Sequence, residues 1–182
     1  MTELDAAIAR IDTEYGAALD DAFTAYYPEL RQIAHARLMR SNLRGQLETT
    51  ALVHESYVKL ATGSEHRFVS RLHFLAYASR TLRSVVVDLV REQRAQRRGG
   101  EFDIVTLNTA VQEGLAGEVD VEAVNSALDD LAALEPGLAR LVEMRFFGGL
   151  TSPEIAEALG MSERTVQRDW SKARALLLTL IR

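Results

Sequence analysis

The chain has 182 residues, 47% of them hydrophobic, and a formal net charge of −5, so it holds one ordinary domain or two small ones with enough apolar side chains for a core. The absence of cysteine excludes disulfides and thiolate metal sites and fits a reducing compartment. The start shows no secretion-signal pattern, and no apolar run approaches about 18 residues, so we expect a cytoplasmic protein with no membrane contact.

The charge is distributed unevenly along the chain. Residues 1–29 carry −6, residues 64–100 carry +5, residues 101–122 carry −6 and residues 162–182 carry +3. A polyanion is attracted by local basic surface rather than by the charge of the whole chain. The net negative charge therefore does not exclude binding to nucleic acid.

Helical periodicity and the presence of only three prolines predict an all-α protein. Pro28 marks a kink or a fresh start in the first predicted helix. From Gly99 and Gly100 onward the periodicity weakens and the charge becomes acidic, which predicts a flexible linker. Helices are predicted at residues 19–38, 53–60, 72–98, 121–134 and 136–147. Two small helical domains, 1–98 and 123–182, are thus joined by an acidic linker at 99–122.

The most specific local pattern lies in "LTSPEIAEALGMSERTVQRDW". Thr151 and Glu154 form a capping box, with Pro153 in the first turn of the helix that they open. Gly160 is suited to the left-handed turn that ends this helix, and Ser162 caps the next one. Two helices joined by a tight turn indicate a helix-turn-helix, whose second helix enters the major groove of DNA.

The second of these helices has a basic outer face. Arg164, Gln167 and Arg168 are the predicted base contacts, and Lys172 is the predicted phosphate contact. The alternative is an ordinary helical hairpin with a solvated basic face.

A second nucleic-acid surface is predicted on the helix at 72–98. A stripe of arginines lies opposite its apolar stripe, although the stripe also fits a solvated surface. Its members are Arg80, Arg83, Arg91, Arg94 and Arg98. In the preceding loop, the cation Arg67 stands beside the aromatic Phe68, a combination that binds unstacked bases. Phe68 equally fits a core anchor.

Three segments resemble the sigma-70 family factors of the extracytoplasmic-function (ECF) group. "LEPGLARLVEMRFFGGLTSPEIAEALGMSERTVQRDWSKARALL" resembles their region 4, "ALVHESYVKL" is similar to their core-binding helix, and "HFLAYASRTLRSVVVDLVREQRAQRR" resembles their promoter-melting helix. Asp88 and Arg91 have the family's D-x-x-R spacing. The segments occur in the family's order and together cover about residues 15–98 and 123–182.

The resemblance implies a bacterial transcription initiation factor. The first domain, sigma region 2, would dock on the β′ coiled coil of RNA polymerase and open the −10 element. Region 4 would read the −35 element and contact the β flap. By position, Arg80, Arg83 and Arg91 would contact the promoter, and the core-binding helix would use Leu52, Glu55 and Lys59.

The sequence departs from the family just before the core-binding helix. Members commonly carry an Asp-Ala-Glu-Asp run where this chain has Glu48, Thr49, Thr50 and Ala51. We hypothesise that a Ser/Thr kinase supplies the missing charge by phosphorylating Thr50 or, as second choice, Thr49. The alternative is that a threonine caps the helix, with core binding carried by Glu48 and Glu55. An anti-sigma factor is a further candidate partner.

The other function classes fit less well. A helix-turn-helix regulator that never binds polymerase would leave the first domain unexplained. The four histidines have no metal-ligand spacing such as HExxH, and no phosphate-binding G-x-x-x-x-G-K or hydrolase G-x-S-x-G motif occurs. We therefore expect no enzyme activity, no metal and no cofactor.

Overall fold

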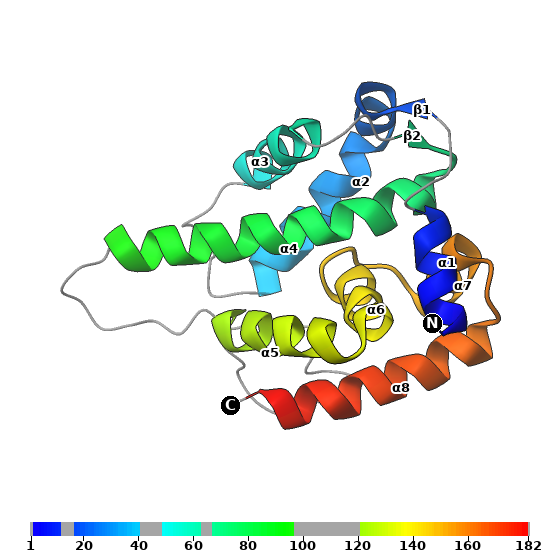
Figure 1. Ribbon diagram of the computed structural model, residues 1–182. Coiled ribbons are helices and arrows are strands. Elements are labelled where there is room, and N and C mark those ends of the chain that lie inside the picture. Colours follow the sequence, from blue (N-terminus) through cyan, green and yellow to red (C-terminus); the bar gives the residue numbers. More distant parts are fainter. Residues whose placement is uncertain (1, 12–16, 41–48, 63–66, 97–120, 182) are drawn as a thin grey trace.

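The structure is a computed structural model that describes residues 2–11, 17–40, 49–62, 67–96 and 121–181 (Figure 1). These residues are helical apart from short turns and a two-residue antiparallel pair, β1 (Ala17–Ala18) and β2 (Arg67–Phe68), which confirms the all-α prediction. The helices are α1 (Glu3–Ile11), α2 (Leu19–Arg40), α3 (Thr49–Ala61), α4 (Arg71–Gln96), α5 (Val121–Leu134), α6 (Pro136–Phe146), α7 (Ser152–Leu159) and α8 (Glu163–Leu180). None of them is long and apolar enough to cross a membrane.

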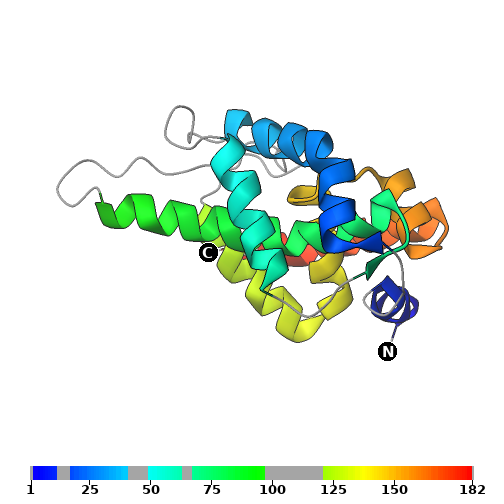
Figure 2. The same ribbon diagram turned by 90° about the horizontal axis from the view of Figure 1, so that it is seen from above.

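Helix α4 lies at the centre of the molecule. It contacts α2 and α3 on one side and α5, α6 and α7 on the other (Figures 1 and 2). Between Leu72 and Val90 the exposed side chains are those of Arg80, Ser84 and Asp88, which recur every fourth residue and so form a single line. The sequence predicted one apolar stripe opposite a basic one. The helix is instead buried on two sides, because the C-terminal half packs against it.

The N-terminal half places α2 and α3 over α4. Helix α2 continues through Pro28, so no fresh helix starts there. Tyr26 of α2 and Phe74 of α4 pack with ring centroids 5.6 Å apart, and Tyr57 of α3 donates a hydrogen bond to Asp20 Oδ1 at 2.8 Å. The first contact joins α2 to the central helix, and the second joins α3 to α2.

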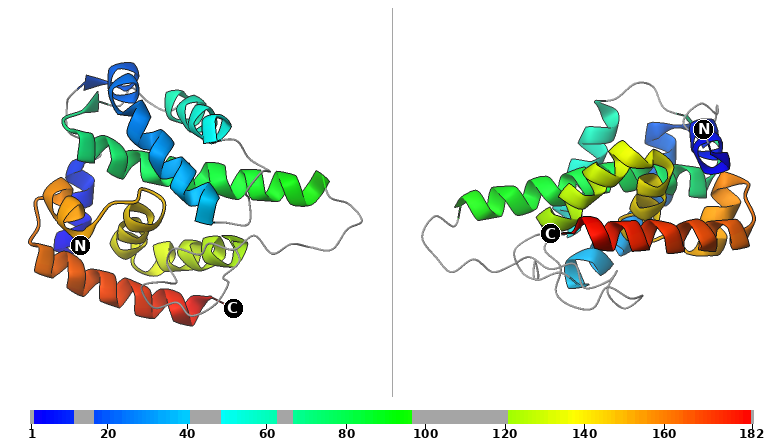
Figure 3. Two further views of the ribbon diagram at one scale, coloured as in Figure 1. Left: turned by 180° about the vertical axis from the view of Figure 1, so that it is seen from behind. Right: turned by 60° about the horizontal axis from the view of Figure 1, so that its bottom comes forward.

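Helix α1 packs on the C-terminal half, against α6 and α7 (Figure 3). Its residues Leu4 and Ala7 are buried, and Arg10 Nη2 donates a hydrogen bond to the Leu159 carbonyl at 3.2 Å. The proposed domain division assigned this segment to the N-terminal domain, and the sequence interpretation did not identify the helix. The predicted linker lies outside the described residues, except that α5 begins at Val121.

Candidate functional site

The predicted caps of α7 and α8 are present. Thr151 Oγ1 accepts a hydrogen bond from the Glu154 backbone, and Glu154 Oε2 accepts one from the Thr151 backbone at 2.9 Å. Gly160 ends α7 with φ 62°, in the left-handed region, and Ser162 Oγ accepts from the Thr165 backbone at 3.1 Å. Local sequence therefore fixes the angle at which α8 leaves the turn.

Helix α8 packs against α5, α6 and α7 through one face. Val166, Ala173 and Leu177 are buried. The Arg145 guanidinium of α6 lies over the Trp170 ring, 4.9 Å from its centroid, and Arg145 also donates to Ser152 Oγ at 2.9 Å. The sequence interpretation missed this contact, because Arg145 and Trp170 lie on different helices.

The outer face of α8 carries the four side chains of this helix that were predicted to contact DNA. Arg164, Gln167, Arg168 and Lys172 are exposed. Arg168 Nε bonds Asp169 Oδ1 at 3.0 Å, and Lys172 Nζ bonds Glu135 Oε1 at 2.7 Å. The Lys172–Glu135 pair is partly exposed on both sides, and surface pairs of this kind contribute only about 0–1 kcal/mol. A phosphate can therefore replace Glu135 as the partner of Lys172 at little cost.

Glu154 also links α7 to α4. Its Oε1 lies 3.3 Å from Arg71 Nη2, and Arg71 Nε pairs with Glu29 Oε2 at 2.6 Å. Burial raises the pKa of Glu154, but hydrogen bonds from Thr151 and Arg71 outweigh it, so the net pKa lies below the ordinary value of 4.5. The folded protein thus favours the ionised carboxylate.

This pKa makes stability depend on pH. Because the folded state holds Glu154 ionised, its contribution is present above about pH 4.5 and is lost as the pH falls through the lower folded pKa. We expect the midpoint of urea unfolding to drop on acidification and to drop less in Glu154→Gln. Equal acid sensitivity in the two proteins would contradict this role for Glu154.

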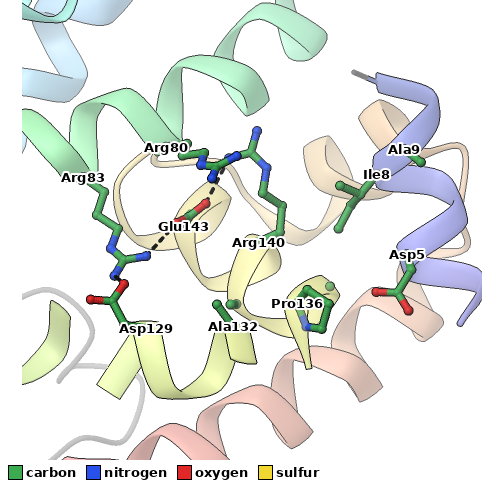
Figure 4. A pocket seen from close by; sticks show the side chains of 12 residues that line it. Asp5, Ile8, Ala9, Arg80, Arg83, Asp129, Ala132, Pro136, Arg140 and Glu143 are labelled. Atoms are coloured by element: carbon green, nitrogen blue, oxygen red, sulfur yellow. Dashed lines mark hydrogen bonds and ion pairs between the residues drawn. The ribbon is translucent and has the colours of Figure 1, made fainter. Parts of the chain in front are cut away.

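The three predicted promoter arginines of α4 differ in accessibility. Arg80 is exposed, and the Arg91 side chain is 57% exposed, with its Nε 3.5 Å from Glu122 Oε1. Arg83 is only 9% exposed and lies between α4 and the helices α5 and α6 (Figure 4). The prediction placed all three on one accessible stripe. This is incorrect for Arg83 in this arrangement, because the C-terminal half covers it.

Phe68 lies in the core. It is 3% exposed, and its ring centroid lies 5.1 Å from that of Phe74 and 5.5 Å from that of Tyr77. A ring enclosed by other rings is not available to stack on a base in this arrangement, which favours the core-anchor alternative. Its neighbour Arg67 is exposed.

The start of α3 carries the two threonines. Thr49 and Thr50 are its first two residues, and its first turn contains no acidic residue. Thr50 is exposed, whereas Thr49 is partly buried, with its hydroxyl 3.4 Å from Nδ1 of His35. Glu48 lies outside the described residues.

The exposed face of α3 differs from the predicted polymerase-binding set. Leu52, which the resemblance placed among the polymerase-binding residues, is 1% exposed and packs into the core, so it does not lie on the accessible face of α3. Lys59 is exposed but bonds Asp88 and Ser84 of α4. The exposed residues at helical spacing are Ala51, His54, Glu55 and Val58, with Val58 53% exposed. The 3- and 4-residue spacing of these four positions, which puts them on one helix face, could have been recognised in the sequence.

No group of three or more metal-ligating side chains occurs within the part of the chain that the structure describes. The sequence profile of a family described as ECF sigma factor matches residues 1–180. No curated protein and no solved structure matches the chain.

Proposed function

Because the chain belongs to the ECF sigma factor family, we propose that it binds core polymerase through the exposed face of α3 and contacts promoter DNA through α4 and α8. Members of this family are not enzymes; they work with the RNA polymerase core and promoter DNA to initiate transcription, often together with anti-sigma factors. The family match over nearly the whole chain carries this proposal, and the accessible faces of α3 and α8 supply its residues.

In the proposed core-binding surface, Val58 is the apolar centre and Glu55 the charged neighbour. When a partner protein buries an exposed valine, the loss of apolar surface to water stabilises the complex. Leu52 packs into the core and holds α3 against the rest of the N-terminal half. Lys59 fixes it to α4, where the ammonium bonds Asp88.

We expect Val58→Asp to weaken binding to purified core polymerase by about 2 kcal/mol, more than tenfold, because a charge would replace an apolar side chain at the centre of the interface. Fluorescence competition binding is the measurement. The matched control is Val69→Asp, since Val69 is 50% exposed and lies outside α3. Failure of the wild-type protein to bind core would instead favour a regulator that acts without polymerase.

For the −35 element, we propose that Arg164, Gln167 and Arg168 contact bases and that Lys172 contacts a phosphate. On α4, Arg80 and Arg91 are the proposed contacts to the −10 region, and Arg67 of β2 is a further proposed contact.

We expect Arg168→Ala to weaken promoter binding by the polymerase complex by about 1–3 kcal/mol, because a base contact is lost. Lys172→Ala should mainly reduce the slope of affinity against salt concentration, by about one unit. Arg31→Ala is the control, since this arginine is exposed on α2. Promoter affinity and salt slope equal to those of the control in both variants would contradict the assignment.

We further propose that a Ser/Thr kinase phosphorylates Thr50 or, as second choice, Thr49, and that this increases the affinity for core polymerase. The support is that Thr50 is exposed in a first turn without an acidic residue, on the helix that carries the proposed core-binding face. A phosphate there would also interact favourably with the helix macrodipole.

A further inference from the structure

A cavity of about 590 Å³ is lined by residues of α1, α4, α5 and α6 (Figure 4). Small-molecule sites in proteins commonly have volumes of roughly 300–1,000 Å³, so this cavity is large enough to hold a ligand. Part of its wall is apolar and is made by Ile8 of α1, Ala132 of α5, and Pro136 and Ala139 of α6. The guanidinium groups of three arginines make another part. The cavity therefore combines an apolar wall with a cationic one.

The first of these arginines, Arg83, is already satisfied by the protein. Its Nε donates to Asn125 Oδ1 at 3.0 Å, and its Nη1 donates to Glu143 Oε1 at 2.9 Å. Its Nη2 donates to the Asn125 carbonyl at 2.9 Å and to Asp129 Oδ1 at 2.6 Å. A guanidinium has five N–H donors, so these bonds leave Arg83 little capacity for a ligand.

Arg80 and Arg140 retain donors. Arg80 of α4 is exposed, and its side chain makes no hydrogen bond or ion pair among the described residues. Arg140 of α6 is only 8% exposed, and its Nη1 contacts Glu143 Oε2 at 3.0 Å and Ser79 Oγ at 3.4 Å. Within the described ranges, its Nε and Nη2 have no acceptor. Figure 4 shows the two side chains pointing toward one another. Buried donors of this kind favour an acceptor supplied from outside the chain.

The carboxylates that line the cavity have other partners. Glu143 is shared between Arg83 and Arg140, so a single negative charge serves two guanidinium groups. Asp5 of α1 lies across the cavity from Arg80 and Arg140 (Figure 4), and its Oδ2 accepts hydrogen bonds from the backbone and the hydroxyl of Thr2, both at 2.8 Å. An anion placed between Arg80 and Arg140 would offset the repulsion between their like charges.

We infer that this cavity binds a small organic phosphate, with its phosphate between Arg80 and Arg140 and its apolar body against Ile8 and Ala132. A phosphate presents three acceptor oxygens, so it can bind guanidinium groups that approach from two different helices. A carboxylate has two oxygens in one plane and matches a single guanidinium fork. The inference goes beyond the proposed function and does not depend on it, because it requires no contact with polymerase or promoter DNA.

Calorimetric titration of the full chain with phenyl phosphate tests the inference. Phenyl phosphate combines the phosphate with a rigid apolar ring, whereas inorganic phosphate lacks the ring and benzoate carries a carboxylate in place of the phosphate. We expect saturable binding of phenyl phosphate, at least about tenfold tighter than that of either other probe. The ring buries apolar surface that inorganic phosphate lacks, and benzoate loses a charged hydrogen bond to one of the two arginines.

Variants test each wall of the cavity separately. Arg80→Gln should weaken phenyl phosphate binding about tenfold or more, because a charge-assisted hydrogen bond is lost. Its control is Arg31→Gln, since Arg31 is an exposed arginine of α2 that does not line the cavity. Ala132→Leu fills the apolar part, so it should weaken binding of phenyl phosphate while leaving that of inorganic phosphate unchanged. Ala133→Leu is its control, at the exposed neighbouring position outside the lining.

The absence of saturable phenyl phosphate binding would overturn the inference. Affinities in Arg80→Gln and Ala132→Leu equal to those of their controls would also overturn it, since the probe would then bind elsewhere. Circular dichroism of each variant verifies that the fold is retained. Inorganic phosphate bound as tightly as phenyl phosphate would contradict the assigned role of the apolar wall, and benzoate bound as tightly would contradict the choice of a phosphate.

Discussion

Phe68→Ala should lower the free energy of unfolding by about 3–5 kcal/mol. The ring is 3% exposed and contacts the rings of His73, Phe74 and Tyr77, so its removal leaves a cavity that these rigid neighbours cannot fill. Urea unfolding followed by circular dichroism measures the change. The control is Val69→Ala, the adjacent residue at 50% exposure, which should change stability by less than about 0.5 kcal/mol.

Phe68→Leu separates a packing role from stacking on a base. Leucine restores much of the buried volume, so most of the stability should return, and promoter opening should be preserved because no base contact is lost. Permanganate reactivity of thymines in the −10 region reads out opening. A stable Phe68→Leu protein without promoter opening would return Phe68 to the set of DNA contacts.

Phosphorylation of Thr50 should strengthen binding to core polymerase by roughly tens to thousands of times. The phosphate adds about −1.5 to −2 charges, and loss of one partner from a close charge pair at an interface typically costs about 2–5 kcal/mol, at 1.4 kcal/mol per tenfold change in affinity. The resemblance to the ECF group implies that an acidic run fills this place elsewhere in the family. The test compares core affinity before and after stoichiometric phosphorylation.

Variants sharpen this test. Thr50→Ala should abolish the increase, and Thr50→Glu should reproduce part of it, whereas Ser126→Glu, which adds the same charge at an exposed site on α5, should not. Thr49→Ala tests the second position, where the hydroxyl lies near His35. Tight core binding by the unphosphorylated protein, unaltered in Thr50→Ala and Thr49→Ala, would contradict the hypothesis.

The parts of the fold that could be predicted are those set by local sequence. Apolar spacing located α2 to α6, and the capping box at Thr151, the left-handed Gly160 and the cap at Ser162 located α7 and α8. Each of these signals is confined to a few residues, because a cap or a turn is satisfied within its own segment. The exposed basic face of α8 followed directly from them.

The parts that could not be predicted depend on contacts between distant segments. The sequence placed Arg83 on a basic stripe, and the resemblance placed Leu52 among the polymerase contacts. In the structure, α5 and α6 cover Arg83, and the core of the N-terminal half encloses Leu52. Helix α1 packs against α6 and α7, which are far away along the chain. Helical periodicity indicates which side chains share a face but not what will pack against it.

Run-off transcription with purified core polymerase tests the central claim most directly. The template is a library of genomic fragments, and the protein is added unphosphorylated and as Thr50→Glu, with core alone as the reference. As a member of the ECF sigma factor family, the protein should produce discrete transcripts absent from the reference, and Arg168→Ala should reduce them. If neither form yields a transcript beyond those of core alone, although both bind core, the proposed role in promoter-specific initiation is contradicted.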